Sequence, residues 1–295
     1  MRTKLYANLA ILGANVLYGV NYIAVHEILP EHSSWQALAL LRGVGALLLF
    51  SFGSFFIRTD TIERNDMWKL AIAGFLGVTV NQSLLVWGIE LSSPVNASII
   101  MTLNPLFVMV LSALILRNPI TRKKILGIVL GASGALMLIV TSRYNEFTGA
   151  HISGDLIILS NAIMYGLYLV WTKPLMKKYG SFTVLKYMFM FGVVPVFFYG
   201  GSGVLQIDIA SLSPMVIGAF VFVIVGATFL TYMLNIIGLK QVNPTTVSIY
   251  IYIQPIVATI ISVILGQDFF SWYKVLSMFL VFVGVYLVTQ TNKES

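Results

Sequence analysis

Residues 94–116, PVNASIIMTLNPLFVMVLSALIL, decide the fold, because a later stretch repeats their polar breaks. That later stretch, residues 244–265, reads PTTVSIYIYIQPIVATIISVIL. An amide followed by proline falls at the same place in both, as Asn104-Pro105 and as Gln254-Pro255. A proline inside an apolar helix frees a backbone carbonyl, which needs a polar partner in hydrocarbon. Interrupted spans at matching positions of two halves indicate a transport site near the bilayer midplane.

The composition is that of a multi-pass membrane protein. Of the 295 residues, 58% are hydrophobic and 10% are charged, and the mean hydropathy is +0.89. These values exclude a soluble globular domain. The apolar runs are continuous and about twice as long as barrel strands, so we expect an all-α protein. The sequence predicts ten spans, near residues 6–29, 35–57, 68–89, 94–116, 125–140, 156–171, 182–200, 215–238, 244–265 and 275–290.

The placement of basic residues predicts the orientation of these spans. Of the 18 lysines and arginines, 14 fall on the side of the N-terminus, two fall in loops on the other side, and Arg42 and Lys186 lie within spans. Positive residues concentrate on the cytoplasmic side of membrane proteins. We therefore expect a protein of the inner or plasma membrane with both termini in the cytoplasm. The net charge of +7 is then a topology signal and does not indicate nucleic-acid binding.

An internal duplication divides the ten spans into two sets of five. A shift of 150 residues pairs identical residues without a gap, among them Gly88 with Gly238, Pro105 with Pro255 and Gly134 with Gly284. Upstream the shift is 147 residues and pairs Tyr18-Gly19 with Tyr165-Gly166. A five-helix unit ends on the opposite side from its start, so the second copy must be inverted. We expect two inverted five-helix repeats, residues 1–143 and 144–295.

Several short motifs resemble those of a known family. Tyr18-Gly19-Val20-Asn21-Tyr22 resembles the aromatic-Gly-x-Asn-aromatic start of EamA-type members of the drug/metabolite transporter superfamily. The ordered set that completes the resemblance is Arg42, Pro105, Gly127, Gly134 and Pro255. The resemblance covers essentially the whole chain. It implies a pseudo-twofold bundle around a central cavity that opens alternately to either side and moves small polar metabolites such as amino acids, often outward.

The chain departs from this family at one place. The family often carries a glutamate just after the fourth span, where this chain reads Arg117-Asn118-Pro119, and the second copy reads Gln267-Asp268. No aspartate or glutamate lies in the middle of a predicted span. A carboxylate that exchanges a proton for a cationic drug is therefore missing, which favours a facilitator or exchanger over a proton-coupled multidrug antiporter.

Polar side chains within spans are candidates for substrate binding, because each must find a partner or line a wet cavity. Asn15 and Tyr18 are three residues apart and share a helix face. Asn81 sits past the middle of the third span, and Asn104 and Gln254 adjoin the breaks at the hinge residues Pro105 and Pro255. The alternative for each is a helix–helix hydrogen bond or a purely structural kink.

Tyrosines within the spans are further candidates for substrate binding, because each presents an aromatic ring that ends in a hydroxyl group. Tyr165 and Tyr168 lie in the sixth span, and Tyr250 shares a helix face with Gln254 in the ninth. Such rings can hold an amino acid side chain or a cation, although an aromatic row in a membrane helix can also serve only for packing. Arg42 is the one formal charge well inside a span, so it pairs with a neighbouring helix, reaches the membrane surface or binds a substrate carboxylate.

Two rival functions have weaker support. Gly131-Ala132-Ser133-Gly134 resembles the nucleophile segment of intramembrane serine proteases, but the only histidines, His26, His32 and His151, fall at the other end of the spans or in loops. A serine nucleophile needs a base within hydrogen-bond reach. A membrane scaffold without transport is the other alternative. We expect a transporter and no enzyme, with a small-molecule substrate and the lipid bilayer as partners, and no cofactor, metal or nucleic acid.

Overall fold

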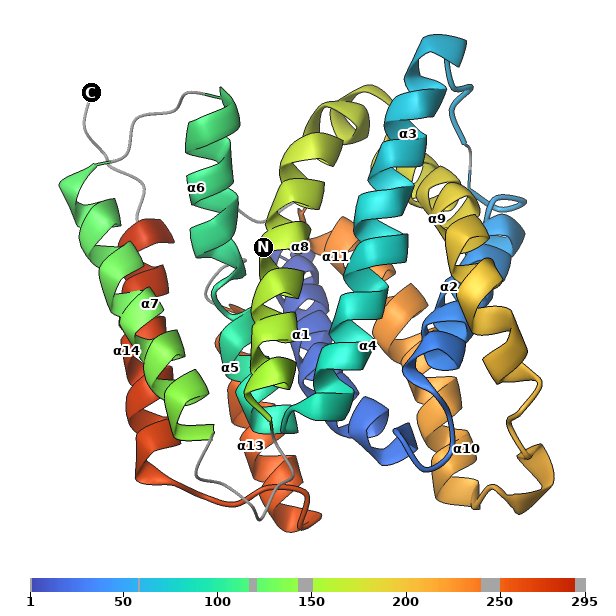
Figure 1. Ribbon diagram of the computed structural model, residues 1–295. Coiled ribbons are helices and arrows are strands. Elements are labelled where there is room, and N and C mark those ends of the chain that lie inside the picture. The colour runs from blue at the N-terminus through green and yellow to red at the C-terminus, as the bar shows by residue number, and fades with distance from the viewer. Residues whose placement is uncertain (1, 58, 117–120, 143–150, 240–249, 290–295) are drawn as a thin grey trace.

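The protein is a bundle of helices in its computed structural model (Figure 1). The structure describes residues 2–57, 59–116, 121–142, 151–239 and 250–289, and these contain no β-strand. Within them, nine helical stretches are long and apolar enough to cross a membrane, and Ile253–Ile264 is a shorter apolar helix. The prediction of an all-α membrane protein is confirmed, and the helix count agrees approximately with ten spans.

The first half of the chain contains five spans. The third is continuous from η1 to α4, and the fourth is divided into α5 and α6. The bounds are α1 Arg2–Ile28, α2 Trp35–Gly53, η1 Arg64–Asp66, α3 Met67–Gly74, η2 Phe75–Val80, α4 Asn81–Leu91, α5 Pro94–Met101, α6 Asn104–Leu116 and α7 Arg122–Ser142.

The second half repeats this order. Its described elements are α8 Ile152–Lys178, α9 Ser181–Val204, η4 Ile209–Ser211, α10 Pro214–Val221, η5 Phe222–Leu230, α11 Thr231–Leu239, α13 Ile253–Ile264 and α14 Trp272–Thr289. The segments η2 and η5 are π-helical and occupy corresponding positions of the third and eighth spans. Such wide turns within α-helices are frequent at functional sites.

The breaks in the fourth and ninth spans precede their prolines. Between α5 and α6 the chain makes a turn at Thr102 and Leu103, and a turn at residues 251–252 precedes α13. Pro105 is therefore the second residue of α6, and Pro255 is the third residue of α13. A proline in the first helical turn removes no intrahelical hydrogen bond. The prolines start new helices after the breaks, which corrects the expectation that they interrupt one continuous helix.

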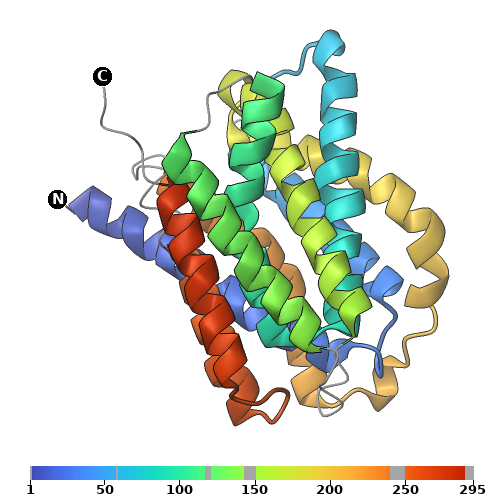
Figure 2. The same cartoon turned by 60° about the vertical axis from the view of Figure 1, so that its left-hand side comes forward.

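Helices pack mainly against helices of the other half. The pairs are α7 with α14, α2 with α9, α4 and α6 with α8, and α1 with both α11 and α13. Figure 2 shows α7 and α14 side by side along their length. Glycines make this contact close, since a Cβ at Gly127 would lie 2.6 Å from the backbone oxygen of Gly284. The halves therefore form one intertwined bundle and share their core.

Polar and apolar side chains are distributed as a membrane requires. Large apolar side chains such as Phe55 and Phe198 lie more than four-fifths exposed on the outside, where lipid would solvate them. Amides and a guanidinium are buried in the middle, among them Asn15, Arg42 and Gln254. This buried polar layer is where a candidate site must be sought.

Candidate functional site

A chain of side-chain hydrogen bonds joins α1 to α13 in the middle of the bundle. The Gln254 side-chain amide donates to Oδ1 of Asn15 at 2.8 Å, and the Tyr22 hydroxyl donates to Oε1 of Gln254 at 3.2 Å. Asn15 in turn donates to the backbone oxygen of Ile11 at 2.8 Å. Close backbone packing supports this contact, because a Cβ at Gly19 would lie 2.9 Å from the backbone oxygen of Gln254. Two predicted site residues, Asn15 and Gln254, are thus direct partners.

Five tyrosines gather beside this chain. Tyr18 lies near Tyr22, Tyr165, Tyr168 and Tyr232, which come from α1, α8 and α11. The rings of Tyr165 and Tyr168 are 5.8 Å apart. Tyr18 and Tyr165, which are paired by the internal repeat, therefore lie in the same cluster and keep part of their surface accessible. The cluster offers hydroxyl groups and aromatic faces from both halves of the chain.

Arg42 lies next to the tyrosine cluster. Its side chain extends from α2 and is 2% exposed, and its Nε donates to Oγ1 of Thr228 at 3.2 Å. Thr228 belongs to the π-helical segment η5, and its hydroxyl donates to the backbone oxygen of Val223 at 2.8 Å. Tyr18, Tyr22 and Tyr232 are the nearest titratable neighbours of the guanidinium. Arg42 therefore donates to an uncharged partner, Thr228, from the second half of the chain.

Asn81 takes part in a reciprocal contact between α4 and α8. The Asn161 side chain donates to the backbone oxygen of Asn81 at 2.5 Å, and the Asn81 side chain points to the backbone oxygen of Asn161 at 3.5 Å. Both residues are buried. The structure thus engages the Asn81 amide in helix packing, which was the alternative to a substrate contact.

Two further predicted residues lie on either side of the central chain. Asn104 begins α6 directly after the break, and its buried Oδ1 has no hydrogen-bond partner in the part of the chain that the structure describes. Tyr250 donates from its hydroxyl to Oδ1 of Asn8 at 3.2 Å, nearer the start of α1 than Asn15. The Asn104 Oδ1 is therefore a buried acceptor that no described residue satisfies, whereas Tyr250 contacts the first turns of α1.

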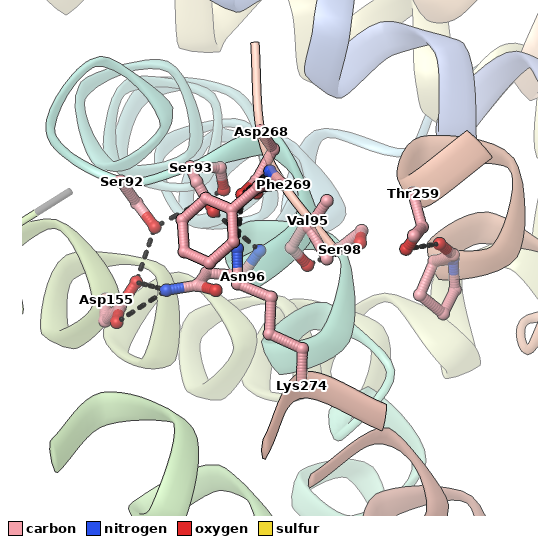
Figure 3. A network of polar contacts seen from close by, with 11 residues as sticks. Ser92, Ser93, Val95, Asn96, Ser98, Asp155, Thr259, Asp268, Phe269 and Lys274 are labelled. Atoms are coloured by element: carbon pink, nitrogen blue, oxygen red, sulfur yellow. Dashed lines mark hydrogen bonds and ion pairs between the residues drawn. The ribbon is translucent and has the colours of Figure 1, made fainter. Parts of the chain in front are cut away.

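A polar network closes the end of the bundle at which α8 begins (Figure 3). Asp155 is fully buried and accepts a hydrogen bond from the Ser92 hydroxyl at 2.5 Å and one from the Asn96 amide at 3.3 Å. These contacts hold the start of α8 against the junction of α4 and α5. Asp155 also lies near Lys274 of α14, so the network includes the last helix.

A buried ion pair completes this network. Lys274 pairs with Asp268, and its ammonium group lies 4.8 Å from the centre of the Phe269 ring. Beside the pair, the Gln267 side chain donates to Glu27 of α1 at 2.8 Å. Gln267 and Asp268, where the sequence departs from the pattern that it otherwise resembles, therefore tie the turn between α13 and α14 to the neighbouring helices. The first-half positions Arg117, Asn118 and Pro119 lie outside the described residues.

The opposite end carries a second cluster of charges. Asp66 is 4% exposed and pairs with Lys69 at 2.6 Å and with Lys178 at 2.8 Å. The Tyr179 hydroxyl donates to the same carboxylate at 2.6 Å. These contacts link the start of the third span to the end of α8. Polar and charged side chains thus bridge helices at each end of the bundle, around Asp155 and Asp268 at one end and around Asp66 at the other. We call these two clusters the end clasps, and the buried polar layer lies between them.

Some of these residues escaped sequence reasoning. Tyr22 lies seven residues after Asn15, two helical turns along the same face, so helical spacing could have identified it. Thr228 and Asn161 gave no such signal, because their roles depend on which helices pack together. The structure does not support the protease hypothesis. Ser133 is exposed, and its hydroxyl donates to the backbone oxygen of Val129 at 2.8 Å. Within the described residues, no group of three His, Asp or Glu could hold a metal ion.

Comparison with known proteins identifies the family to which these features correspond. The model of the EamA-like transporter family matches residues 5–140 and 152–290. Transporters of unknown substrate are similar over most of the chain. One from Bacillus subtilis, YyaM, is 25% identical over 93% of this chain and 90% of its own length. One from Archaeoglobus fulgidus is 28% identical over 86% of this chain and 88% of its own length.

Two other similarities are more limited. A protein of Streptantibioticus cattleyicolor, named a probable terminal-alkyne amino-acid exporter, is 30% identical over 44% of this chain and 42% of its own length. A crystal structure with 16% identity superposes with a TM-score of 0.63 over 96% of both chains. This last similarity concerns the fold alone.

Proposed function

The chain belongs to the EamA-like transporter family, and from this premise we propose that it moves small polar metabolites by alternating access through a central cavity. The protein is a multi-pass membrane transporter and, like its family, not an enzyme. We propose the cell membrane as its location, with both termini in the cytoplasm, and residues 1–143 and 144–295 as its two repeats. The lipid bilayer and a small-molecule substrate are its partners.

Amino acids are the favoured substrates, and export or exchange is the favoured direction. The name of the Streptantibioticus relative supports this choice over its matched region. The lack of a carboxylate in the middle of any span fits a facilitator or exchanger. Amide, hydroxyl and guanidinium groups in the buried layer suit a substrate with both polar and apolar parts.

The hydrogen-bond chain from Tyr22 through Gln254 to Asn15 is the observation that carries this proposal. It brings together residues 232 and 239 positions apart in the sequence and so bonds α1 of the first half of the chain to α13 of the second. A substrate that enters here can replace contacts between the halves with contacts to itself. We assign Asn15, Tyr18, Arg42, Asn104, Tyr165, Tyr168 and Gln254 to the substrate cavity, with Asn81 and Tyr250 supporting it through α8 and α1.

In the proposed mechanism, the two end clasps open in turn, so that the cavity is accessible from one end at a time. The Asp155 and Asp268 network closes one end, and the Asp66 cluster ties helices at the other. Alternating access requires that the clasp at one end opens while the other holds. The breaks before Pro105 and Pro255 lie between the central layer and these ends. We propose that these breaks are the hinges.

Flux measurements test the proposal. The purified protein is reconstituted into liposomes, and a panel of labelled amino acids is assayed for movement down a gradient, with protein-free liposomes as the baseline. We expect saturable flux of at least one amino acid and its loss in Gln254→Ala. Thr259→Ala is the matched control, since the Thr259 hydroxyl donates only within its own helix, to Pro255. Flux of none of the panel would overturn the substrate proposal.

A further inference from the structure

The Arg42 guanidinium carries a donor nitrogen that no described residue engages. Its Nε donates to Thr228, but the buried Nη1 has no hydrogen-bond partner among the residues that the structure describes. An arginine presents a rigid fork of donors that matches a carboxylate with two parallel hydrogen bonds. The contact to Thr228 fixes the side chain and leaves a donor of this fork free.

Within the residues that the structure describes, no acidic side chain pairs with Arg42. All eleven aspartates and glutamates of the sequence lie near span ends, in loops or at the C-terminus. The titratable groups that interact with the guanidinium are the tyrosines Tyr18, Tyr22 and Tyr232. Their hydroxyls are neutral dipoles, so the centre of the bundle keeps a net positive charge. Burying a charge without a counter-charge is costly, and an anion that binds here recovers part of that cost.

The position that corresponds to Arg42 in the second half of the chain carries no charged residue. The 147-residue shift that pairs Tyr18 with Tyr165 places Phe189 opposite Arg42. The Phe189 ring lies 5.8 Å from the Tyr232 ring and 5.5 Å from the Phe50 ring. One half of the chain therefore places a cation at this position, and the other places a fully buried benzyl ring that packs against Tyr232 and Phe50. The rings of Tyr18 and Tyr165 keep part of their surface accessible beside the guanidinium, so a matching ligand has one anionic end and one apolar end.

We propose that Arg42 binds the carboxylate of the transported substrate and that the carrier requires this group. The inference rests on the proposed transport function and deepens it, because it states which part of an amino acid is recognised. Among the described residues the buried central layer offers no carboxylate for an ammonium group, so the proposal makes the amino group dispensable. The substrate class is then monocarboxylates with an apolar side chain, which includes amino acids and their hydroxy-acid counterparts. Thr228 is a positioning residue that orients the guanidinium.

Competition by matched analogues tests this assignment in the unaltered protein. The labelled amino acid that gives the highest flux is challenged with its amide, its decarboxylated amine and its hydroxy acid. For leucine these are leucinamide, isoamylamine and leucic acid. We expect the hydroxy acid to compete as well as the amino acid within a few fold. We expect the amide and the amine to compete on the order of 100-fold less well, because both lack the partner of a buried charge.

Variants then connect the selectivity to the residue. Arg42→Gln should abolish the preference for the acid over the amide, and Arg42→Lys should weaken it, because a lysine keeps the charge without the fork. Thr228→Val should reduce the preference while the protein remains folded, as judged by gel filtration and thermal unfolding. Lys186→Gln is the matched control, since it removes the other cation of the predicted spans, whose ammonium group donates to the Ser54 hydroxyl.

The outcomes separate the two proposals. Absence of flux for every amino acid of the panel overturns the proposed amino-acid substrate, and with it the carboxylate assignment that rests on it. Flux with equal competition by acid, amide and amine overturns the carboxylate assignment and leaves the transport proposal standing. Unchanged acid-over-amide selectivity in a folded Arg42→Lys or Thr228→Val variant also overturns the role of Arg42, even if Arg42→Gln fails to fold.

Discussion

The side-chain amide of Gln254 lies 2.8 Å from Oδ1 of Asn15, so that α13 of the second half is bonded to α1 of the first in the middle of the bundle. The Tyr22 hydroxyl donates to the same glutamine. Under the proposed mechanism, a contact of this kind serves both stability and function, because the atoms that hold the halves together here would face the substrate when the halves separate. The predictions below distinguish these two roles for individual residues.

Gln254→Leu removes the bonds to Asn15 and Tyr22 while preserving most of the side-chain volume. We expect the flux to fall at least about tenfold and the free energy of unfolding to fall by about 1 kcal/mol, which is typical of a hydrogen bond between membrane helices. Liposome flux and thermal unfolding measure the two effects. Thr259→Val, on the same helix, should change neither by a comparable amount, and equal losses in both variants would remove Gln254 from the site.

Asn104→Ala should affect transport without affecting stability. The Asn104 Oδ1 has no partner in the described part of the chain, so the loss of this oxygen breaks no described hydrogen bond. We expect the free energy of unfolding to change by less than about 0.5 kcal/mol and the flux to fall severalfold. A stability loss without a loss of flux would show that Asn104 serves the helix break alone.

Asn161→Ala should show the opposite pattern. The Asn161 amide donates to the backbone of Asn81 at 2.5 Å and holds α8 against α4. We expect the protein to lose about 1 to 2 kcal/mol of stability, while the apparent affinity for the substrate stays within a few fold. The comparison with Asn104→Ala uses the same substitution in the same assay. A large change in substrate affinity would place this contact in the cavity.

Gly19→Ala tests the close approach of α1 and α13. An added Cβ would lie 2.8 Å from Cβ of Val257 and 2.9 Å from the backbone oxygen of Gln254, so the helices must separate. Overpacking of this kind costs about 1 to 3 kcal/mol, and the unfolding temperature should fall accordingly. Gly218→Ala is the matched control, since nothing lies within 4 Å of its Cβ position. Equal stability of the two variants would contradict this packing.

Asp268→Asn weakens the ion pair with Lys274 and should open that end of the bundle more often. The chain has no cysteine, so a single Ser98→Cys substitution reports access to α5, where Ser98 is fully buried. In intact cells we expect severalfold faster labelling by a membrane-impermeant maleimide. Asp66→Asn at the other end should leave the labelling rate unchanged or lower it. No increase with Asp268→Asn would mean that this pair does not control opening.

The sequence alone predicted much of the architecture. Apolar length and the placement of basic residues gave the span count, and the Asn104-Pro105 and Gln254-Pro255 pairs located both helix breaks to within a few residues. These features depend on local composition and spacing, which a sequence displays directly. The position of each proline after its break was missed, because an apolar window does not show where hydrogen bonding stops.

The partners within the site could not be predicted in the same way. Lys274 looks like an ordinary loop cation that marks the outer side, yet it is 4% exposed and paired with Asp268. Asp155 stands at a span end in the sequence and is fully buried in the structure. Arg42 and Thr228 are 186 residues apart. Such contacts depend on which helices adjoin across the halves, and that depends on the packing of the whole bundle.

The pairing of α1 with α11 and α13, of α2 with α9 and of α7 with α14 means that neither half covers its own apolar faces. A gene cut between the repeats should therefore yield two fragments that are degraded when made singly and persist when made together. An ancestor of half this length could have worked only as an obligate pair of copies. Fusion of such copies into one chain would free each to diverge, and Arg42 in one half with Phe189 at the corresponding position of the other is the kind of difference that two identical copies could not carry.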